Sequence, residues 1–393
     1  MGFVVYNEHA RRGSLHRRIS ISLRAGTHPV NELGYDPAFV SMRAAVYRGP
    51  GILRIEEVPV PEVARGEMLV RADACGVCGT DIKKIQRGLL SAPRIFGHEI
   101  AGTVARLGPG VTRFREGDRV ALHHHVPCLD CFFCRAGDYA QCADYKRNGT
   151  TAGFEPAGGG FAEYVKAMDW IVARGAIPIP AGVATEAAAF VEPVNTCLKA
   201  VRKARIRQGE TVLVVGQGAI GLLLTQLCRW AGAEVLASDM LPDRLELSRK
   251  LGAASAVPAS ADVASEVRAL TGGRGVDCAF LAALGQAPFT QAVDATRPGG
   301  RIMVFAATSP GEMASLDLGA LCAAEKELLT SYSASVEVQD LAAQLVFGRE
   351  IRVEELITHR FPLAEAARAV EVASRPAPGV LKVVLQAPAR APR

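Results

Sequence analysis

Two patterns of hydrophobic and polar positions divide the chain. From about Leu53 to Ala173, short stretches alternate apolar and polar residues between frequent Gly and Pro, which is typical of half-buried strands in a β-rich domain. The pattern then changes, because Thr211–Gly216 is a short continuous apolar run and the apolar stretch after it, to about Ala231, has helical length. Strand and helix patterns alternate from there on. This alternation predicts an α/β fold with a parallel, doubly wound sheet.

The same changes predict the domain organisation. Residues before Met42 carry several arginines and little apolar periodicity, which is typical either of an organellar transit peptide or of a disordered extension from an upstream start codon. After about Ser335, a helical pattern and the stretches Ile351–Leu356 and Val380–Leu385 favour a return to the β-rich domain. We therefore expect a leader over residues 1–41 and a β-rich domain over 42–200, with a small lobe at 123–146 inside that domain. A doubly wound domain is expected over 201–334, and a C-terminal return to the β-rich domain over 335–393.

Composition and charge argue against several classes of protein. Of the 393 residues, 49% are hydrophobic and 22% charged, as in an ordinary globular protein, and no apolar run approaches the ~18 residues that a membrane-spanning helix needs. The formal net charge is +5, but the basic residues are scattered and balanced by 40 acidic ones, so they favour neither a nucleic-acid nor a membrane partner. Ten cysteines in a long chain without a secretory signal pattern favour a reducing compartment, and we expect a cytoplasmic protein.

A glycine motif marks the start of the doubly wound region. Residues 216–221 read G-Q-G-A-I-G, a G-x-G-x-x-G that directly follows a predicted strand and begins a predicted helix. Gly216 would permit the tight turn, Gly218 would let the backbone approach a pyrophosphate, and Gly221 would allow close packing of helix on strand. Ile220 is expected to line the floor of the site. The motif in this context predicts a dinucleotide site, with the phosphates at the helix N-terminus.

The predicted cofactor is NAD rather than NADP. Asp239 ends the second strand, 23 residues after Gly216, where a carboxylate accepts hydrogen bonds from the adenosine ribose and repels a 2′-phosphate. Arg244 lies close by and could instead serve the phosphate of NADP. The neutral Met240 beside Asp239 makes that alternative less favourable, so we expect NAD.

Four cysteines form a compact pattern within the β-rich region. The spacing is C-x2-C-x2-C-x7-C, in residues Cys128, Cys131, Cys134 and Cys142. Four thiolates at such spacing can complete the tetrahedral shell of a structural zinc ion. Iron–sulfur ligation uses similarly short spacings and is the alternative. The preceding His123–His125 could also bind a metal, but we interpret these histidines as solvated polar residues beside the lobe.

A second set of potential ligands is dispersed along the sequence. A catalytic zinc needs about three protein ligands and an open position for water or substrate. The candidates are a thiol, an imidazole and two carboxylates, in Cys78, His98, Glu99 and Glu192. Each also has an ordinary interpretation, such as a buried thiol for Cys78, a core histidine for His98 and a charge before a proline for Glu192. Their spacing alone leaves both interpretations open.

Taken together and in this order, the motifs resemble those of the zinc-dependent medium-chain dehydrogenases, in particular the branch of sorbitol (L-iditol) and other polyol dehydrogenases. The resemblance extends from about Met42 to Leu385 and includes the cysteine lobe, the glycine motif, and the segments Gly97–Gly102, Gly117–Val120 and Glu192-Pro193. It implies a GroES-like β-barrel catalytic domain into which a Rossmann domain is inserted. It also implies a homo-oligomer, usually a tetramer, with a dimer as the alternative.

The resemblance implies roles for individual residues. Cys78 and His98 correspond to catalytic zinc ligands, and Glu99 to a further ligand or its catalytic neighbour. Glu192 corresponds to a carboxylate that binds the metal directly or through water. Thr80 corresponds to the catalytic hydroxyl that passes on the substrate proton.

Two further positions bear on the cofactor and on the proton. Asp239 and Arg244 resemble the pair that holds the adenosine ribose in the family. Lys83, by contrast, occupies the position where many members have a histidine that relays the proton to solvent, and it is the candidate for that catalytic relay. Lys84 stands where sorbitol dehydrogenases often have an aromatic residue. Both ammonium groups would favour a hydroxyl-rich or anionic substrate if they face the pocket, whereas the alternative is that they point from a helix into solvent.

These observations predict a zinc-dependent, NAD-linked dehydrogenase with two zinc ions per chain and a small-molecule alcohol as substrate. The expected reaction transfers a hydride to NAD from a secondary alcohol of a polyol, sugar or cyclitol, with a short diol or an amino alcohol such as threonine as alternatives. Other hypotheses are a non-catalytic binding protein on the same scaffold and a nucleic-acid-binding ribbon at the cysteine lobe. The set of catalytic ligands argues against the first, and the sequence lacks the flanking basic and aromatic residues that the second requires.

Overall fold

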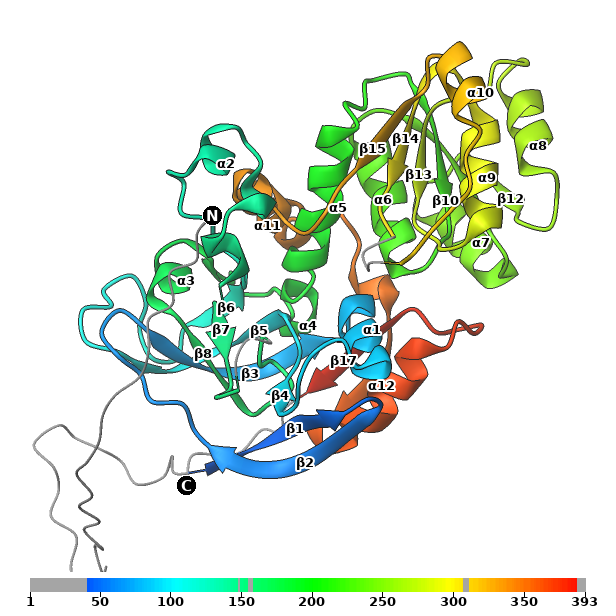
Figure 1. Cartoon of the computed structure of the whole chain (residues 1–393). Helices are drawn as coiled ribbons and strands as arrows, with labels where there is room; N and C mark the ends of the chain where they lie inside the picture. Colours follow the sequence, from blue (N-terminus) through cyan, green and yellow to red (C-terminus); the bar gives the residue numbers. More distant parts are fainter. Residues whose placement is uncertain (1–40, 148, 155–157, 307–310, 387–393) are drawn as a thin grey trace, which may run out of the picture. The chain divides into compact units, whose positions relative to one another are not determined.

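The computed structural model describes residues 41–147, 149–154, 158–306 and 311–386, so the predicted leader lies outside the described residues except for Ser41. In these ranges the chain forms a group of mainly antiparallel strands and one parallel sheet, with helices packed on both (Figure 1). None of the helices in these ranges is long and apolar enough to cross a membrane.

The antiparallel strands come from both ends of the described chain. One sheet has the order β2-β1-β4, and a larger one has the order β16-β17-β3-β5-β6-β9, with β8 paired to β3 and β7 to β8. Met68, Val70 and Ala72, alternate residues of β3, lie in one buried core, as the period of two in a strand requires. The strands are β1 Ser41–Gly49, β2 Ile52–Pro59, β3 Met68–Gly76, β4 Arg94–Ile95, β5 Glu99–Leu107, β6 Arg119–Leu122, β7 Thr150–Thr151, β8 Tyr164–Ala167, β9 Ala176–Pro178, β16 Ile357–Pro362 and β17 Lys382–Gln386.

The parallel sheet has the strand order of a dinucleotide-binding domain. From edge to edge the strands are β12-β11-β10-β13-β14-β15, which is 3-2-1-4-5-6 in chain order. Its strands are β10 Thr211–Val215, β11 Glu234–Asp239, β12 Ser255–Pro258, β13 Val276–Leu281, β14 Thr296–Val304 and β15 Glu327–Thr330. The helices that follow them are α6 Ala219–Trp230, α7 Pro242–Lys250, α8 Val263–Leu270, α9 Gln286–Ala295 and α10 Leu318–Ala323.

Both faces of this sheet are buried. Val212 and Val214 of β10 belong to the core that includes α6, whereas Leu213 and Val215 belong to a second core with α8 and α9. Burial on both sides explains why β10 is a continuous apolar run in the sequence rather than an alternating one. The predicted α/β fold, a doubly wound parallel sheet combined with a β-rich domain, is confirmed.

In the described part of the chain, seven more α-helices connect or cover the strands. They are α1 Gly79–Arg87, α2 Phe132–Arg135, α3 Asp169–Arg174, α4 Thr185–Ala188, α5 Val191–Lys203, α11 Gln339–Phe347 and α12 Ala366–Ser374. In α5, Val194, Leu198 and Val201 recur at helical spacing and are buried in the core shared with α6 and α11. This packing fixes the helix that carries Glu192 in its first turn.

Candidate active site and metal centres

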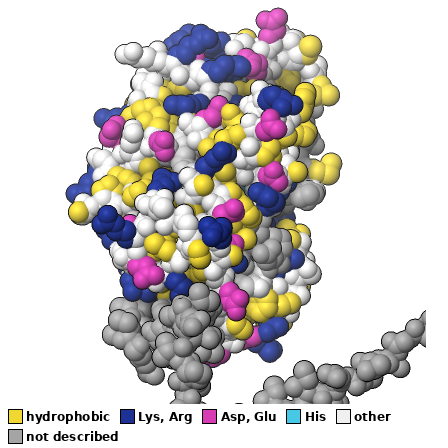
Figure 2. All heavy atoms as spheres, turned by 90° about the vertical axis from the view of Figure 1, so that its left-hand side faces the viewer, with side chains coloured by type: hydrophobic (Ala, Val, Ile, Leu, Met, Phe, Trp, Pro, Cys, Tyr) yellow, Lys and Arg dark blue, Asp and Glu magenta, His cyan; other side chains and the backbone are white. Residues whose placement is uncertain are grey.

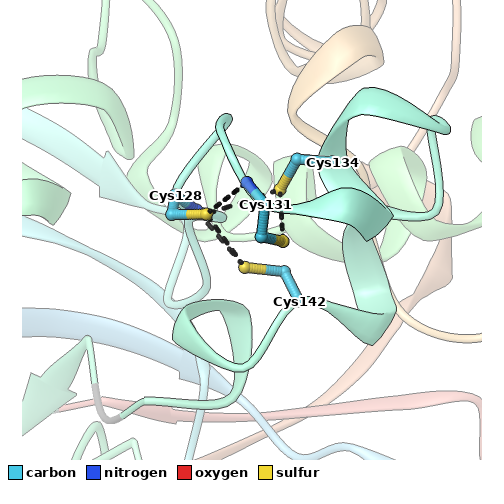
Figure 3. A group of neighbouring side chains, drawn as sticks. All are labelled: Cys128, Cys131, Cys134 and Cys142. Carbon is cyan, nitrogen blue, oxygen red and sulfur yellow. Dashed lines mark hydrogen bonds between the residues drawn. The ribbon is translucent and has the colours of Figure 1, made fainter.

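The four predicted lobe cysteines lie together. Cys131 caps the N-terminus of α2, Cys134 lies within α2, and Cys142 follows the short 3-10 helix Tyr139–Gln141. Figure 3 shows the sulfur atoms gathered in one group. Three of the S···S separations within the group are 3.6, 3.6 and 3.8 Å. A tetrahedral zinc ion with Zn–S bonds of about 2.3 Å requires edges of about 3.8 Å. The donor set therefore fits one tetrahedral metal ion.

Backbone amides polarise one of these thiols. The N–H groups of Asp130 and Cys131 point at the sulfur of Cys128, with N···S distances of 3.5 and 3.3 Å. These donors lower the pKa of Cys128 to about 7, whereas burial raises the pKa of Cys134 to about 12. All ten cysteines of the chain are free thiols. Cys128 is therefore more readily present as a thiolate than Cys134.

A second group of potential ligands brings together residues that are distant in the sequence. Cys78 caps the N-terminus of α1, Glu99 is the first residue of β5, and His98 precedes it. One ligand atom of each lies within 4.8 Å of the others. Gly97 has a φ of +93°, and a Cβ there would come within 2.5 Å of the Phe161 ring. Both facts explain why the turn that presents His98 needs a glycine.

The imidazole of His98 is oriented by a buried carboxylate. Its Nδ1 lies 3.1 Å from Oδ1 of Asp81, a residue of α1 that is 1% exposed. Burial lowers the pKa of His98, but the interactions with Asp81 and Cys78 together raise it by more. The pKa of His98 therefore lies well above that of free histidine. The pair leaves Nε2 for a metal, since ligating histidines donate their other N–H to a partner such as a carboxylate. Asp81 was not predicted to have a role in the site, although a carboxylate three residues after Cys78 could have indicated one.

Glu99 is paired with a lysine from the other end of the chain. Nζ of Lys382, on β17, donates to Oε1 of Glu99 at 2.6 Å, and both residues are buried. Gly76 of β3 lies beside this pair, where a Cβ would come within 1.8 Å of Oε2 of Glu99. The ammonium group compensates the buried carboxylate. Lys382 was not predictable as a site residue, because no local pattern in the sequence indicates that a lysine pairs with a residue 283 positions away.

Glu192 is a buried carboxylate with a different environment. It is 9% exposed, and burial raises its pKa to about 7 against the opposing charge of His98. It is not among the residues whose ligand atoms lie within 4.8 Å of one another, in the part of the chain that the structure describes. In the same part of the chain it forms no ion pair, whereas Glu99 is paired with Lys382. Glu192 is therefore freer than Glu99 to turn toward a metal ion or its water.

Thr80 and Lys83 lie one turn apart on α1. Thr80 is half-buried in the first turn of the helix. Nζ of Lys83 donates to the carbonyl oxygen of Ala306 at 3.2 Å and lies 3.0 Å from Oε1 of Glu312. The alternative that Lys83 points into solvent is therefore wrong, and its ammonium group contacts the chain that follows β14. Lys84 is half-buried on the same helix.

The interpretation of His123–His125 as solvated residues is wrong. The N–H of His123 donates to the carbonyl oxygen of Gly175 at 2.8 Å, so the segment continues directly from the end of β6. His123 is 3% exposed, and burial lowers the pKa of His123 to about 4 and that of His125 to about 3. These rings are neutral near pH 7, and a neutral imidazole can be buried at a far smaller cost than a charged one.

The glycine motif forms the turn between β10 and α6. Gly216 has a φ of +91°, and Gly218 caps the N-terminus of α6. A Cβ on Gly221 would come within 1.8 Å of the carbonyl oxygen of Gly216, so glycine lets the helix approach the turn. A Cβ on Gly218 would meet only Nη1 of Arg244, at 3.9 Å, which leaves space for a phosphate. Ile220 is half-buried and packs against the core that contains α5 and α6.

Asp239 is held at the end of β11 by backbone donors. The N–H of Gln217 donates to Oδ2 at 2.6 Å, and that of Leu241 donates to Oδ1 at 2.9 Å. Nη1 of Arg244 lies 3.9 Å from Oδ2 of Asp239, while its Nη2 donates to the carbonyl oxygen of Val380 at 3.0 Å. The structure thus brings both members of the predicted ribose pair to the glycine turn.

The charged side chains on one face of the molecule are mixed in sign. Figure 2 shows Lys and Arg interspersed with Asp and Glu on that face, with hydrophobic atoms between them. Such mixing gives the face no concentrated positive potential of the kind that attracts a nucleic-acid backbone.

Comparison with known proteins finds relatives over most of the chain. Residues 64–181 match the family model of the alcohol dehydrogenase GroES-like domain, and residues 219–347 match that of the zinc-binding dehydrogenases. Sorbitol dehydrogenase of Bacillus subtilis (strain 168) is 31% identical over 280 residues, which cover 70% of this chain and 77% of the relative. An alcohol dehydrogenase of Cupriavidus necator is 32% identical, over 88% of this chain and 98% of the relative. A solved zinc-binding dehydrogenase of Sinorhizobium meliloti 1021, bound to NADP, has a TM-score of 0.79 and 29% identity, over 88% of this chain and 99% of that one.

Proposed function

Because the chain belongs to the zinc-dependent medium-chain alcohol and polyol dehydrogenases, we propose that it oxidises a secondary alcohol of a polyol, sugar or cyclitol to the ketone. The proposed hydride acceptor is NAD, and the proposed metal content is two zinc ions per chain. The observation that carries the proposal is the group formed by Cys78, His98 and Glu99, whose ligand atoms lie within 4.8 Å of one another and apart from the cysteine lobe.

The residues of this group fit an open zinc site. We propose that Cys78, His98 and one carboxylate hold the catalytic ion. Glu192 is the better candidate for direct or water-mediated contact, because Glu99 is engaged in a buried ion pair. A zinc ion bound there would supply Lewis-acid chemistry that lowers the pKa of the substrate hydroxyl. The second ion belongs to the four cysteines of the lobe, where a closed shell stabilises the local fold.

Thr80 is the proposed first acceptor of the substrate proton. Thr80 lies in the first turn of α1, two residues after Cys78, which caps that helix. This places Thr80 near the proposed ligands in the sequence and on the same element. The residues proposed to hold and move this proton toward solvent are Thr80 and then Lys83, which lies one helical turn further on and is paired with Glu312. A bound cofactor would add its ribose hydroxyls to this route. The nicotinamide itself supplies the hydride-accepting chemistry.

The preference for NAD is proposed from the ribose end of the dinucleotide site. The carboxylate of Asp239, beside the glycine turn, would accept hydrogen bonds from the ribose hydroxyls and repel a 2′-phosphate. Met240 is 80% exposed next to it and offers no positive charge to such a phosphate. Arg244 is already hydrogen-bonded to the carbonyl oxygen of Val380. The relative from Sinorhizobium meliloti is bound to NADP, so both cofactors belong in the test.

We also propose the domain boundaries, the assembly and the compartment. A catalytic domain over 42–200 with its lobe at 123–146, a Rossmann domain over 201–334 and a return over 335–393 agree with the grouping of the strands, because β16 and β17 join the sheet of β3. The protein is proposed to be a homo-oligomer, a tetramer or a dimer. A cytoplasmic location is supported by the ten free thiols, which suit a reducing compartment.

A substrate screen tests the proposed function. The protein is supplied with NAD or NADP and with polyols, sugars, cyclitols, short diols, threonine, ethanol and 2-propanol, and the reduced cofactor is followed by its absorbance. We expect kcat/KM for a polyol, sugar or cyclitol with NAD to exceed that for ethanol at least tenfold, about 1.4 kcal/mol of transition-state discrimination. Turnover of the simple alcohols with inert polyols would contradict the polyol proposal. A best rate with a diol or threonine would replace it by the alternative substrate.

A further inference from the structure

Four aromatic rings form a continuous row of tilted ring contacts that starts at a proposed metal ligand. The ring of His124 lies against that of His98, with centroids 4.8 Å apart, and against that of His125, with centroids 3.9 Å apart. The ring of His125 lies in turn against that of Tyr145, at 4.9 Å. Centroid separations up to about 7 Å are those of interacting aromatic rings. These four residues, His98, His124, His125 and Tyr145, form a ring ladder.

Both ends of the ring ladder are held in place. The ring of His98 is fixed by its 3.1 Å contact with Asp81. At the other end, Tyr145 is 1% exposed, and its hydroxyl lies 2.8 Å from that of Ser333 and donates to the carbonyl oxygen of Ala334 at 2.9 Å. The ladder therefore spans two anchored side chains rather than ending at a mobile one.

The far end of the ring ladder belongs to the cysteine lobe. Tyr145 packs in one buried cluster with Cys134 and Cys142, two of the proposed zinc ligands of the lobe. His124 and His125 lie between this cluster and His98. The ladder is therefore a packed connection from one proposed metal centre to the other.

Ring contact is the main interaction of the two middle residues. Nδ1 of His124 and Nδ1 of His125 are buried and have no hydrogen-bond partner in the described ranges. The ring of His125 also has a hydrogen bond with the backbone of Arg147. Because unsatisfied buried nitrogens are unfavourable, hydrogen bonding does not explain why histidines occupy these places. Both side chains contribute tilted ring contacts to the interior.

We propose that His124 and His125 are positioning residues, which hold the ring of His98 and couple the cysteine lobe to the catalytic metal site; this rests on the proposed function, because it presupposes a metal at Cys78 and His98. Asp81 fixes one edge of the His98 ring, and the face of His124 limits its tilt. Interiors are close-packed, so a displaced ring displaces its neighbour. Order in the lobe is thereby transmitted to the direction of Nε2 of His98.

The test removes and restores one middle ring without touching a proposed ligand. His125→Ala removes the ring, and His125→Phe restores a ring without its nitrogens. The variants and the unchanged protein are loaded with Co²⁺, and two quantities are measured: the d–d spectrum of the ion at Cys78 and His98, which differs from that of the four-cysteine site because it has a single thiolate ligand, and the rate of Co²⁺ loss from that site to a chelator. We expect His125→Ala to lose this Co²⁺ about tenfold faster, with shifted bands, as for residues that orient a metal ligand. His125→Phe should remain within about twofold of the unchanged protein.

Two further variants keep the test decisive. Tyr145→Phe retains a ring in the core and removes only its anchor at Ser333 and Ala334, and it should also lose Co²⁺ faster than the unchanged protein. His359→Ala is the matched control, because it removes a histidine ring on β16 that lies against Phe361 outside the ladder. It should leave the spectrum and the rate unchanged. Melting temperatures of the metal-free proteins separate these effects from a general loss of fold.

The outcomes are distinguishable. Equal rates for His125→Ala, Tyr145→Phe and the unchanged protein would overturn the coupling while leaving the metal site and the proposed function intact. Equal acceleration in His125→Ala and His125→Phe would also overturn it, because the ring would then not be the element that matters. An unchanged protein that binds Co²⁺ only at the four cysteines would overturn the proposed metal site, and the coupling with it.

Discussion

Cys78 and Cys131 each direct a sulfur atom at a proposed zinc ion, but their surroundings differ. The group around Cys78 is held by buried side chains of its own, among them the ion pair between Glu99 and Lys382. Cys131 lies against a small cluster in which the other lobe cysteines supply much of the buried apolar contact. At the residue scale, the same substitution should therefore have opposite consequences for activity and for stability.

We predict that Cys78→Ser removes most of the activity and one zinc ion per chain, and changes the melting temperature by no more than a few degrees. Cys131→Ser should instead lower the melting temperature by about 5 °C or more, because a closed tetrathiolate site contributes folding free energy directly. Steady-state kinetics, elemental analysis and thermal unfolding measure the three quantities. The reverse behaviour of the two variants would show that the catalytic and structural sites are exchanged.

Single residues were predictable from the sequence where their chemistry lies within a short window. Four cysteines within 15 positions can be grouped from spacing alone, because a short chain cannot separate them far. The partner of Glu99 could not be found in this way, since β17 reaches β3 only in the folded sheet. His123–His125 were misplaced because polarity does not reveal that a segment continues a buried strand. The pairing of His98 with Asp81 could have been predicted, because ligating histidines donate their other N–H to a partner such as a carboxylate.

At the element scale, the predicted strands that agree best with the structure are those buried on both faces. Thr211–Gly216 exceeds β10 by one residue, because the strand is an apolar run that ends at the glycine turn. The pairing of the strands was not predictable from the sequence, and neither were the hydrogen bonds that the side chain of Gln217 makes. That side chain donates to the carbonyl oxygen of Val214 at 3.0 Å and accepts a hydrogen bond from Thr225 at 3.0 Å, which ties the glycine turn to α6.

The glycine turn allows a matched pair of substitutions. Gly221→Ala places a Cβ within 1.8 Å of the carbonyl oxygen of Gly216, so the helix must move and we expect a loss of about 1–3 kcal/mol in the free energy of unfolding. Gly218→Ala has no such clash without cofactor, the nearest atom being at 3.9 Å, and should leave stability unchanged. Its methyl group would occupy the space proposed for the pyrophosphate, so we predict at least a tenfold rise in the Kd for NAD.

Denaturant unfolding and NAD titration followed by fluorescence measure these two effects. A stable Gly218→Ala variant with unchanged affinity would show that the pyrophosphate does not approach this turn. An unchanged stability for Gly221→Ala would show that α6 can retreat from β10 without cost. The pair separates the role of a glycine in packing from its role in ligand approach, which a single substitution cannot do.

At the scale of the whole molecule, the catalytic fold is completed by residues that the sequence places at opposite ends of the described chain. β16 and β17 pair within the sheet of β3, although all six strands of the parallel sheet lie between them and β3 in the sequence. Lys382, the first residue of β17, brings its ammonium group to Glu99, 283 positions earlier. Within the described ranges this pair lies beside the proposed catalytic ligands, so the completion of the sheet and the charge balance of the site depend on the same contact.

That dependence leads to a prediction on stability that needs no metal. Lys382→Met leaves the buried carboxylate of Glu99 without its counter-ion and should lower the free energy of unfolding of the metal-free protein by about 3–5 kcal/mol. Lys382→Met combined with Glu99→Gln removes the uncompensated charge as well and should recover most of that loss, since a buried pair and a neutral replacement differ little in stability.

Lys250→Met is the matched control, because Lys250 pairs with Glu355 at 3.1 Å with its side chain 66% exposed, and an exposed pair contributes at most about 1 kcal/mol. Urea unfolding at pH 7 measures all four proteins. If the double variant is no more stable than Lys382→Met alone, the lysine stabilises the sheet through its packing rather than through its charge, and Glu99 is then available to the proposed metal on equal terms with Glu192.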